Sequence, residues 1–334
     1  MNPPNPFPIL HLPFLAIEEV FKAMHSFEII KFSLITKRTK AVAMQMTFLP
    51  RYSIQLNIQS RNRLEVCVVG PKYRTICCYS FLSDEKMDGE VVESDRADCY
   101  EIYACKYSIN PVEGWKQFCK HVLEIFKKQT VNVLTLYMDA FVDHNVSFID
   151  FLKTNVKSVT ECNLDQSDEK NNVDEHAAYF LKNITVTNEL ISFLHHKNAY
   201  FNGKFPKHLK KLFIKNSEWI GYEKLLEIDC EHVVLKQNRI TNEEWNMFLK
   251  KWMAMETHSN LKNLEVNYRE LEEFRALVLH DIPHEVVDGG VKRVIKTRCR
   301  ETYEITGGVD IRRIDGKTAT FFVYRDFHFA MNIH

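Results

Sequence analysis

Histidine and cysteine are the side chains of this sequence that most often carry nucleophilic, acid–base or metal chemistry. Cys77 and Cys78 are adjacent in a segment with strand composition, where buried, unreactive thiols are usual. His280 and His284 have the four-residue spacing of a helical metal pair, but Pro283 between them would break that helix. We therefore expect no catalytic and no metal-ligating residues in these pairs.

The short motifs that imply a mechanism are also missing from the sequence. There is no G-x-G-x-x-G, no phosphate-binding loop, no H-E-x-x-H and no C-x-x-C. Glycine supplies only 10 of the 334 residues, which disfavours loops that cradle phosphate. We expect no cofactor and no enzymatic activity, although an enzyme whose site the sequence does not reveal stays an open alternative.

Composition and cysteine usage limit the cellular setting and the partners. Nine cysteines, spread from Cys67 to Cys299 without a short repeated spacing, indicate reduced intracellular thiols rather than a disulfide framework. Neither a signal peptide nor an apolar run of the ~20 residues needed to span a bilayer is visible. Basic and acidic residues balance at 44 each, so nucleic acid and membranes are not expected as partners. We expect a cytoplasmic or nuclear protein.

The N-terminal part has the pattern of three short helices. Pro13 suits the start of the first, because a proline lacks the N–H that is unpaired there anyway. A second helix can follow Ser26 as N-cap, and a third covers residues 34–43. The apolar positions of the first helix recur at spacings of three and four: Phe14, Ile17, Val20, Phe21 and Met24. Such small helices cannot bury this surface among themselves, so part of it must pack elsewhere.

Residues 46–110 have β composition. We expect four strands, with an exposed acidic loop over Ser83–Asp98 between the third and the fourth. This region is either a cap on the following array or a connecting module. The expected strands are Tyr52–Ile58, Leu64–Val69, Thr75–Phe81 and Tyr100–Tyr107.

Residues 111–330 show a loose repeat of the form apolar-x-x-apolar-x-apolar. The six segments are Val131/Leu134/Leu136, Val156/Val159/Glu161, Leu181/Ile184/Val186, Leu209/Leu212/Ile214, Cys230/Val233/Leu235 and Leu261/Leu264/Val266. Helical stretches are expected at Trp115–Lys128, Val146–Lys153, Asn188–His195, Tyr222–Glu227 and Asn242–Met255. One strand and one helix per repeat is the leucine-rich-repeat arrangement, in which each unit buries its faces on its neighbours. Leucine-rich repeats often have an Asn at a fixed position after the strand, and in this sequence only one repeat has it, at Asn238. An ordinary α/β domain with a parallel sheet therefore remains the alternative.

Two local signals near the C-terminus are specific. Thr241 and Glu244 have the spacing of a capping box at the start of a helix. Val309–Ile314 and Thr318–Val323 alternate around an Asp-Gly pair, which predicts a hairpin. The fold class is therefore α+β or α/β: a three-helix N-terminal module, a β-rich portion, an irregular repeat array and a C-terminal hairpin.

Several segments together resemble a known family. Residues 12–21, 32–34 and 36–38 are similar to an F-box, in particular to the divergent F-box of nematode proteins. Residues 241–245, 248–252, 260–265, 307–313 and 315–320 look like the second type of F-box-associated domain. The sequence departs from the F-box pattern at Leu15 and Ala16, and lacks the common Trp after Lys37. Residues 1–10 are rich in proline and are expected to form a flexible tip. By the resemblance, residues 11–45 are an F-box and residues 111–330 are an F-box-associated domain.

The resemblance implies a substrate-recognition subunit of an SCF-type cullin–RING ubiquitin ligase, with no chemistry of its own. The F-box binds the adaptor subunit, and through it a cullin, while the C-terminal domain holds a protein substrate. An interaction scaffold whose F-box no longer engages the ligase is the alternative. The adaptor contacts implied by position are Leu12, Pro13, Ile17, Val20, Phe21 and Leu34.

Substrate contacts are expected on the outward positions of the repeat strands, because alternate side chains of a strand point to opposite faces. Two neighbouring segments combine basic side chains with an aromatic ring there: Lys211, Phe213, Lys215, His232 and Lys236. This would be a basic patch for an acidic or phosphorylated segment, and a solvated surface without a ligand is the competing interpretation.

Overall fold

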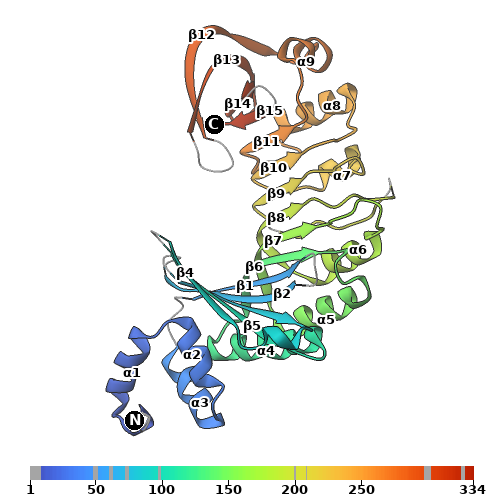
Figure 1. Cartoon of the computed structure of the whole chain (residues 1–334). Coiled ribbons are helices and arrows are strands. Elements are labelled where there is room, and N and C mark those ends of the chain that lie inside the picture. Colours follow the sequence, from blue (N-terminus) through green and yellow to red (C-terminus); the bar gives the residue numbers. More distant parts are fainter. Residues whose placement is uncertain are drawn as a thin grey trace. The chain divides into compact units, whose positions relative to one another are not determined.

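The computed structural model describes residues 9–47, 52–59, 63–71, 75–96, 99–198, 201–207, 209–296, 302–324 and 328–334. The expected flexible tip lies outside these ranges except for its last two residues, which open a 3-10 turn, η1 (Ile9–His11). The chain divides into two compact units, Met1–Val159 and Thr160–His334. Both units combine helices with strands, so the expected mixed class is confirmed (Figure 1).

Unit 1 opens with three helices, as the apolar spacing predicts. α1 begins directly after Pro13. The N-cap of α2 is His25 and not Ser26, which is the first helical residue and donates its hydroxyl to the Val68 carbonyl at 3.4 Å. α3 starts later than expected, because Thr36 is its N-cap. The helices are α1 (Phe14–Ala23), α2 (Ser26–Ser33) and α3 (Lys37–Met46).

The sheet of unit 1 has the strand order β6-β1-β2-β3-β5-β4. β6 pairs in parallel with β1, and β5 in parallel with β3, while the other neighbours are antiparallel. The acidic segment 83–98 is not only a loop, as expected, because β4 lies within it and pairs with β5. The strands are β1 (Ser53–Gln59), β2 (Arg63–Val69), β3 (Thr75–Leu82), β4 (Val91–Arg96), β5 (Cys99–Tyr107) and β6 (Thr130–Tyr137).

Two longer helices complete unit 1. Trp115 of α4 is fully buried, and its indole Nε1–H donates to the Glu65 carbonyl of β2 at 3.0 Å, so this helix packs on the sheet. The helices are α4 (Pro111–Ile125) and α5 (Asn145–Asn155), with short 3-10 turns η3 (Glu85–Met87) and η4 (Val142–His144).

Unit 2 has the strand order β7-β8-β9-β10-β11-β15-β14-β13-β12. Strands β8 to β11 pair in parallel, and β12 to β15 form an antiparallel end that joins β11 through β15. The strands are β7 (Ser158–Asp165), β8 (Val186–Ser192), β9 (Lys211–Ile214), β10 (His232–Leu235), β11 (Asn263–Val266), β12 (His284–Lys296), β13 (Thr302–Arg312), β14 (Thr318–Tyr324) and β15 (His328–Ile333). The helices are α6 (Asp174–Asn183), α7 (Tyr222–Leu226), α8 (Asn242–Met253) and α9 (Leu271–Val278).

Two predicted elements of the repeat were wrong. Leu181 belongs to α6, and the strand predicted around it begins only at Val186. The predicted helix over residues 188–195 is instead occupied by β8 and the loop after it. The strand predicted from Val156 is shifted, since the buried residues of β7 are Val159, Cys162 and Leu164. A short run of apolar residues fits a helix face and a strand almost equally well, and this ambiguity explains the errors.

The predicted C-terminal hairpin is confirmed. Val309 of β13 lies opposite Phe321 of β14, and the two strands pair in antiparallel register. The turn between them closes with the Arg313 N–H donating to the Lys317 carbonyl at 2.9 Å. Gly316 has φ 90°, a conformation that glycine adopts without steric strain.

Candidate interaction surfaces

Two of the six predicted adaptor contacts form the core of the N-terminal helices. Ile17 is 8% exposed and Phe21 only 1%. The Phe21 ring meets Phe32 edge to face at 5.5 Å between centroids, and Ile29 and Ile30 of α2 are fully buried. These side chains hold the helices together. Substituting them would therefore destabilise the helical module itself, and a loss of adaptor binding would not identify them as contacts.

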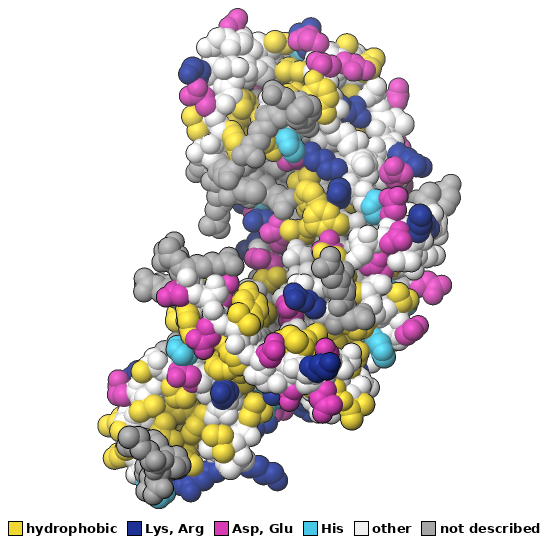
Figure 2. Space-filling model, in the orientation of Figure 1, with side chains coloured by type: hydrophobic (Ala, Val, Ile, Leu, Met, Phe, Trp, Pro, Cys, Tyr) yellow, Lys and Arg dark blue, Asp and Glu magenta, His cyan; other side chains and the backbone are white. Residues whose placement is uncertain are grey.

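The other predicted contacts are more accessible. Leu34 is 46% exposed, Pro13 is exposed, and Leu12 and Val20 are half-buried. The predicted contacts do not include Phe14, Leu15 and Ile35, although their side chains are 57%, 73% and 68% exposed. The contacts were assigned by position in the F-box resemblance, which carries no information on exposure. We call the exposed set the N-terminal apolar surface: Pro13, Phe14, Leu15, Leu34 and Ile35. Figure 2 shows hydrophobic side chains gathered over these helices.

Polar contacts fasten α2 and α3 to the rest of unit 1. The Ser33 hydroxyl lies 3.0 Å from His121 Nε2 on α4, and the Lys40 ammonium pairs with the Glu124 carboxylate at 2.5 Å. Burial lowers the pKa of His121, and the nearby Lys40 charge lowers it further. The helical module therefore both packs on its own unit and keeps apolar side chains exposed.

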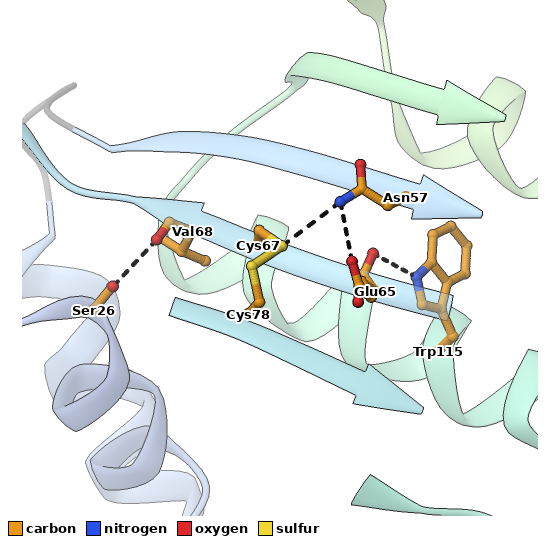
Figure 3. The surroundings of a disulfide bond; sticks show 7 residues. All are labelled: Ser26, Asn57, Glu65, Cys67, Val68, Cys78 and Trp115. Carbon is orange, nitrogen blue, oxygen red and sulfur yellow. Dashed lines mark hydrogen bonds between the residues drawn. A yellow bond between two sulfur atoms is a disulfide. The ribbon is translucent and has the colours of Figure 1, made fainter. Parts of the chain in front are cut away.

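The strands beneath this module contain a disulfide, which corrects the expectation of reduced thiols throughout. Cys67 of β2 and Cys78 of β3 are register partners with Cα atoms 4.1 Å apart, and their sulfurs are bonded (Figure 3). Asn57 Nδ2 lies 3.8 Å from the Cys67 sulfur. The pairing depends on strand register, which cysteine spacing alone does not reveal. The neighbouring Cys77 is buried, and burial raises its thiol pKa to about 12, so that thiol is unreactive as expected.

In unit 2 three of the five predicted substrate contacts lie on the neighbouring strands β9 and β10, and Lys215 and Lys236 directly follow these strands. His232 of β10 is the register partner of Lys211 on β9, and Phe213 lies two residues further along the same face. Lys215 Nζ lies 5.7 Å from the centroid of the Phe193 ring, which is itself 5.5 Å from the Phe213 ring. The structure thus brings the predicted residues together, and their role in substrate binding remains a prediction.

The charge of this strand face differs from the predicted basic patch. Lys211 pairs with Glu189 of β8 at 3.6 Å, and Lys236 pairs with Glu265 of β11 at 2.6 Å. Burial alone would raise the pKa of Glu265, but hydrogen bonds from Lys236 and two further side chains lower it below its usual value, so the carboxylate stays ionised. The parallel register places these acids beside the lysines, and the face is a mixed-charge surface around aromatic rings.

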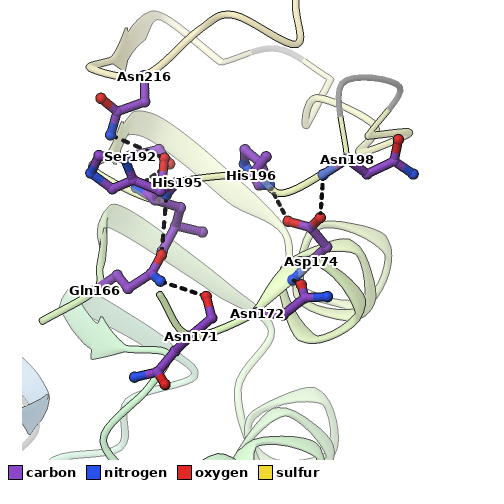
Figure 4. Close-up of polar contacts among 10 residues, drawn as sticks. Gln166, Asn171, Asn172, Asp174, Ser192, His195, His196, Asn198 and Asn216 are labelled. Carbon is purple, nitrogen blue, oxygen red and sulfur yellow. Dashed lines mark hydrogen bonds and ion pairs between the residues drawn. The ribbon is translucent and has the colours of Figure 1, made fainter. Parts of the chain in front are cut away.

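Side-chain amides join the loops that follow the parallel strands (Figure 4). Gln166 Oε1 accepts from the His195 backbone N–H at 3.1 Å, and Asn216 Nδ2 donates to the carbonyls of Phe193 and Leu194, both at 3.2 Å. The bonded amides follow the apolar strand positions by one to three residues. That variable offset explains why a fixed Asn position found only Asn238. The amides after the strands are Gln166, Asn216, Asn238 and Asn267.

A pocket of about 230 Å³ lies among these loops, after β8, β9 and β10. Trp219 is among its lining residues, and its indole packs edge to face on the Phe201 ring at 5.0 Å and on the His196 imidazole at 5.2 Å. His196 Nδ1 lies 2.8 Å from the Asp174 carboxylate. Burial lowers the pKa of His196 although Asp174 raises it, so the ring is neutral near pH 7 and donates from Nδ1. The lining residues are His195, His196, Lys197, Asn216, Glu218, Trp219, Gln237 and Arg239.

Within the described ranges, no group of three or more His, Cys, Asp or Glu side chains is arranged to hold a metal ion. No helix among those residues is long and apolar enough to cross a bilayer.

Comparison with known proteins gives a family match for part of unit 2. Residues 200–266 match the family described as F-box associated, a segment that contains β9 to β11 and both Asn216 and Trp219. The chain is also 23% identical over 348 residues to the Skn-1 dependent zygotic transcript 15 protein of Caenorhabditis elegans, covering 94% of this chain and 93% of that protein. No solved structure matches the chain significantly. The F-box-associated resemblance is thereby confirmed for residues 241–265, and the F-box resemblance of residues 12–38 stays a prediction.

Proposed function

We propose that this chain is the substrate-recognition subunit of an SCF-type cullin–RING ubiquitin ligase. The observation that carries the proposal is the pairing, in one chain, of an F-box-associated match at residues 200–266 with an N-terminal three-helix module that exposes apolar side chains. The similarity to the Caenorhabditis elegans protein extends along nearly the whole of both chains. This supports the interpretation that the N-terminal helices and the F-box-associated segment belong together in one kind of protein.

Unit 1 would bind the adaptor subunit and, through it, the cullin. Leu15 at 73% and Ile35 at 68% exposure are unusually accessible for large apolar side chains, and exposed apolar groups of this kind favour protein partners. A few such side chains generally supply most of the energy of a protein interface.

Unit 2 would hold the substrate protein. Its parallel strands, with helices between several of them, and the side-chain amides that join the loops after these strands support the leucine-rich-repeat-like interpretation of the F-box-associated domain. The mixed-charge strand face, including Lys211, Phe213 and Lys236, is a suitable docking surface for a protein. The receptor itself would perform no chemistry and would act in the cytoplasm or nucleus by raising the local concentration of substrate lysines near the conjugating enzyme.

Co-purification of the full-length chain with an SCF adaptor subunit tests this proposal. We expect the parent chain to retain the adaptor, and the double variant Leu12→Ala, Pro13→Ala to lose at least about tenfold in affinity, because two apolar anchors are truncated. A second variant, Leu15→Ala, changes a side chain that contributes little to the fold, since it is 73% exposed.

Ile109→Ala is the matched control, because Ile109 is 89% exposed in the same unit but lies outside the N-terminal apolar surface. It should bind the adaptor as the parent does, and circular dichroism should show that all variants are folded. A folded parent chain that fails to bind any adaptor subunit contradicts the ligase function and favours the interaction scaffold.

A further inference from the structure

Strand β4 is an open edge of the sheet in unit 1. It pairs with β5 on one side, and among the described residues it has no strand on its other side. The two strands are antiparallel, and the carbonyl of Glu90, directly before β4, accepts from the Cys105 N–H at 2.8 Å. Because backbone groups alternate in direction along an antiparallel pair, those of Val92 and Ser94 face β5. The residues whose backbone N–H and C=O groups point away from the sheet are Val91, Glu93 and Asp95.

The two faces of β4 differ in chemistry. Val92 is 61% exposed and its register partner Tyr103 on β5 is 40% exposed, so an apolar pair lies open on one face. Glu93 and Asp95 are exposed and lie on the opposite face, because neighbouring positions of a strand alternate. A strand added to this edge would therefore meet carboxylates on one face and apolar side chains on the other.

The negative charge of this edge is not compensated. Residues 84–96 contain six acidic and two basic residues. In the part of the chain that the structure describes, no Lys or Arg side chain lies within ion-pair distance of these acids. The lysines of the strand face in unit 2 differ in this respect, since Lys211 and Lys236 each pair with a glutamate.

The edge strand of unit 2 shows that an open edge alone is not enough. The pairing of β12 with β13 is interrupted by a bulge between Val287 and Lys292, and Lys292 pairs with Glu304 at 2.7 Å. A bulge is one of the usual protections of an edge against a further strand. β4 keeps a continuous register with β5 from Val91 to Arg96, so its outer edge is regular.

We propose that β4 accepts an extended segment of a partner protein as an additional strand, and that this segment alternates basic and apolar residues. Side chains directly opposite each other in paired strands lie on the same face and interact. Basic residues two positions apart would face Glu93 and Asp95, and the apolar residues between them would lie beside Val92 and Tyr103. A second copy of β4 is a poor occupant, because like charges opposite each other are destabilising.

Amide hydrogen exchange of the full-length chain tests this strand addition, with each amide resolved by NMR. The probes are three hexapeptides with acetylated and amidated ends: Lys-Val-Lys-Val-Lys-Val, its rearrangement Lys-Lys-Lys-Val-Val-Val, and the acidic Glu-Val-Glu-Val-Glu-Val. Hydrogen-bonded amides exchange only when the structure around them opens. We expect the alternating basic peptide at saturation to slow exchange at least about tenfold at the outward amides of Val91, Glu93 and Asp95.

The pattern of protection decides the result. Slower exchange at the three outward amides with the alternating basic peptide, and not with the other two, supports the proposal. Binding without this protection would show charge attraction alone and overturns it, as do equal protection by the rearranged or acidic peptide and an absence of binding. Protection that grows with the concentration of the chain alone would identify a second copy as the occupant and also overturns it.

A charge reversal on the strand tests the selection of a basic partner. Asp95→Lys should bind the alternating basic peptide about fivefold more weakly in calorimetry, because an attractive pair becomes a repulsive one. Glu85→Lys is the matched control: it makes the same change of charge at an exposed position of the same acidic segment, but in η3 and not in β4. It should bind almost as the parent does, and equal weakening in both variants would contradict strand pairing.

The inference does not rest on the proposed ligase function. Adaptor retention is measured through the N-terminal apolar surface, whereas peptide binding is measured at β4. A chain that retains the adaptor but binds none of the peptides keeps the proposed function and refutes the added strand.

Discussion

Burial controls the protonation of individual histidines in unit 2. His258 is 6% exposed, its ring meets Phe248 edge to face at 5.0 Å, and burial lowers its pKa from 6.5 to about 4. His196 is also shifted down by burial, although its partner Asp174 opposes the shift. At these sites the loss of hydration outweighs any nearby negative charge, so the neutral imidazole is the folded form near pH 7.

This shift predicts a pH dependence of stability. The unfolded chain binds a proton at His258 near pH 6.5, whereas the folded chain binds it only near pH 4, so acid favours unfolding. The stabilisation is complete above about pH 6.5 and declines as the pH falls toward 4, by about 1 kcal/mol at pH 5.5. His258→Asn should remove this part of the decline, and asparagine tolerates the local φ of 49°.

Urea denaturation of the parent and His258→Asn at about pH 7.5 and about pH 5.5 measures this difference. The two chains should lose different amounts of unfolding free energy between these pH values, with the larger loss in the parent. A histidine NMR titration in which His258 protonates near its ordinary pKa of 6.5 would contradict the assignment.

Helix α8 shows how local sequence determines an element. Thr241 Oγ1 accepts from the Glu244 N–H at 3.2 Å, and the Glu244 carboxylate accepts from the Thr241 N–H at 2.8 Å. The predicted capping box is therefore present, and the apolar face behind it is buried as its spacing predicted. The buried side chains of that face are Trp245, Phe248, Leu249 and Trp252.

Removing the cap should destabilise α8 by a limited amount. Thr241→Ala loses the acceptor for an N-terminal N–H, and we expect the unfolding free energy to fall by about 1 kcal/mol. Thr241→Ser keeps the hydroxyl and should remain close to the parent in a urea titration. If both substitutions have the same effect, the methyl group and not the cap is responsible.

The errors in element prediction have a common cause. The segments around Leu181 and Asn188 alternate apolar and polar residues too irregularly to separate a helix face from a strand. In the folded chain, β8 becomes a strand because it completes the parallel row with β9, where Glu189 lies opposite Lys211. Pairing with the neighbouring strand, which is a tertiary interaction, therefore decides that residues 186–192 form a strand and not a helix.

At the scale of the whole molecule, the two proposed activities lie in separate units. The N-terminal apolar surface belongs to unit 1, and the mixed-charge strand face belongs to unit 2. Mutations at distant, independent sites usually have additive effects, so each activity should be removable without the other.

This separation makes a prediction for two variants assayed side by side. Leu15→Ala should weaken adaptor retention, whereas Phe213→Ala on the strand face of unit 2 should leave adaptor retention unchanged. Adaptor pull-down with both variants beside the parent measures this difference. Equal loss of adaptor retention in both variants would indicate a general folding defect or coupling between the units.

The sequence alone determined the features that depend on short-range spacing. These include the three N-terminal helices, the capping box at Thr241, the hairpin around Gly316 and the strands β9 to β11. Each is specified by periodicity or turn chemistry within a few residues, so neighbouring residues suffice to predict it.

Only the tertiary structure decided the properties that depend on register between strands and on burial. Strand register places Cys67 beside Cys78, where they form a disulfide, and Lys211 beside Glu189, where they form an ion pair. Strand packing also brings Asn216 and Trp219 to the lining of one pocket. Burial separated Phe21, which holds the N-terminal helices together, from Leu15, which is available to a partner. The residues concerned are distant in sequence or identical in type, so their environments become distinct only when the chain packs.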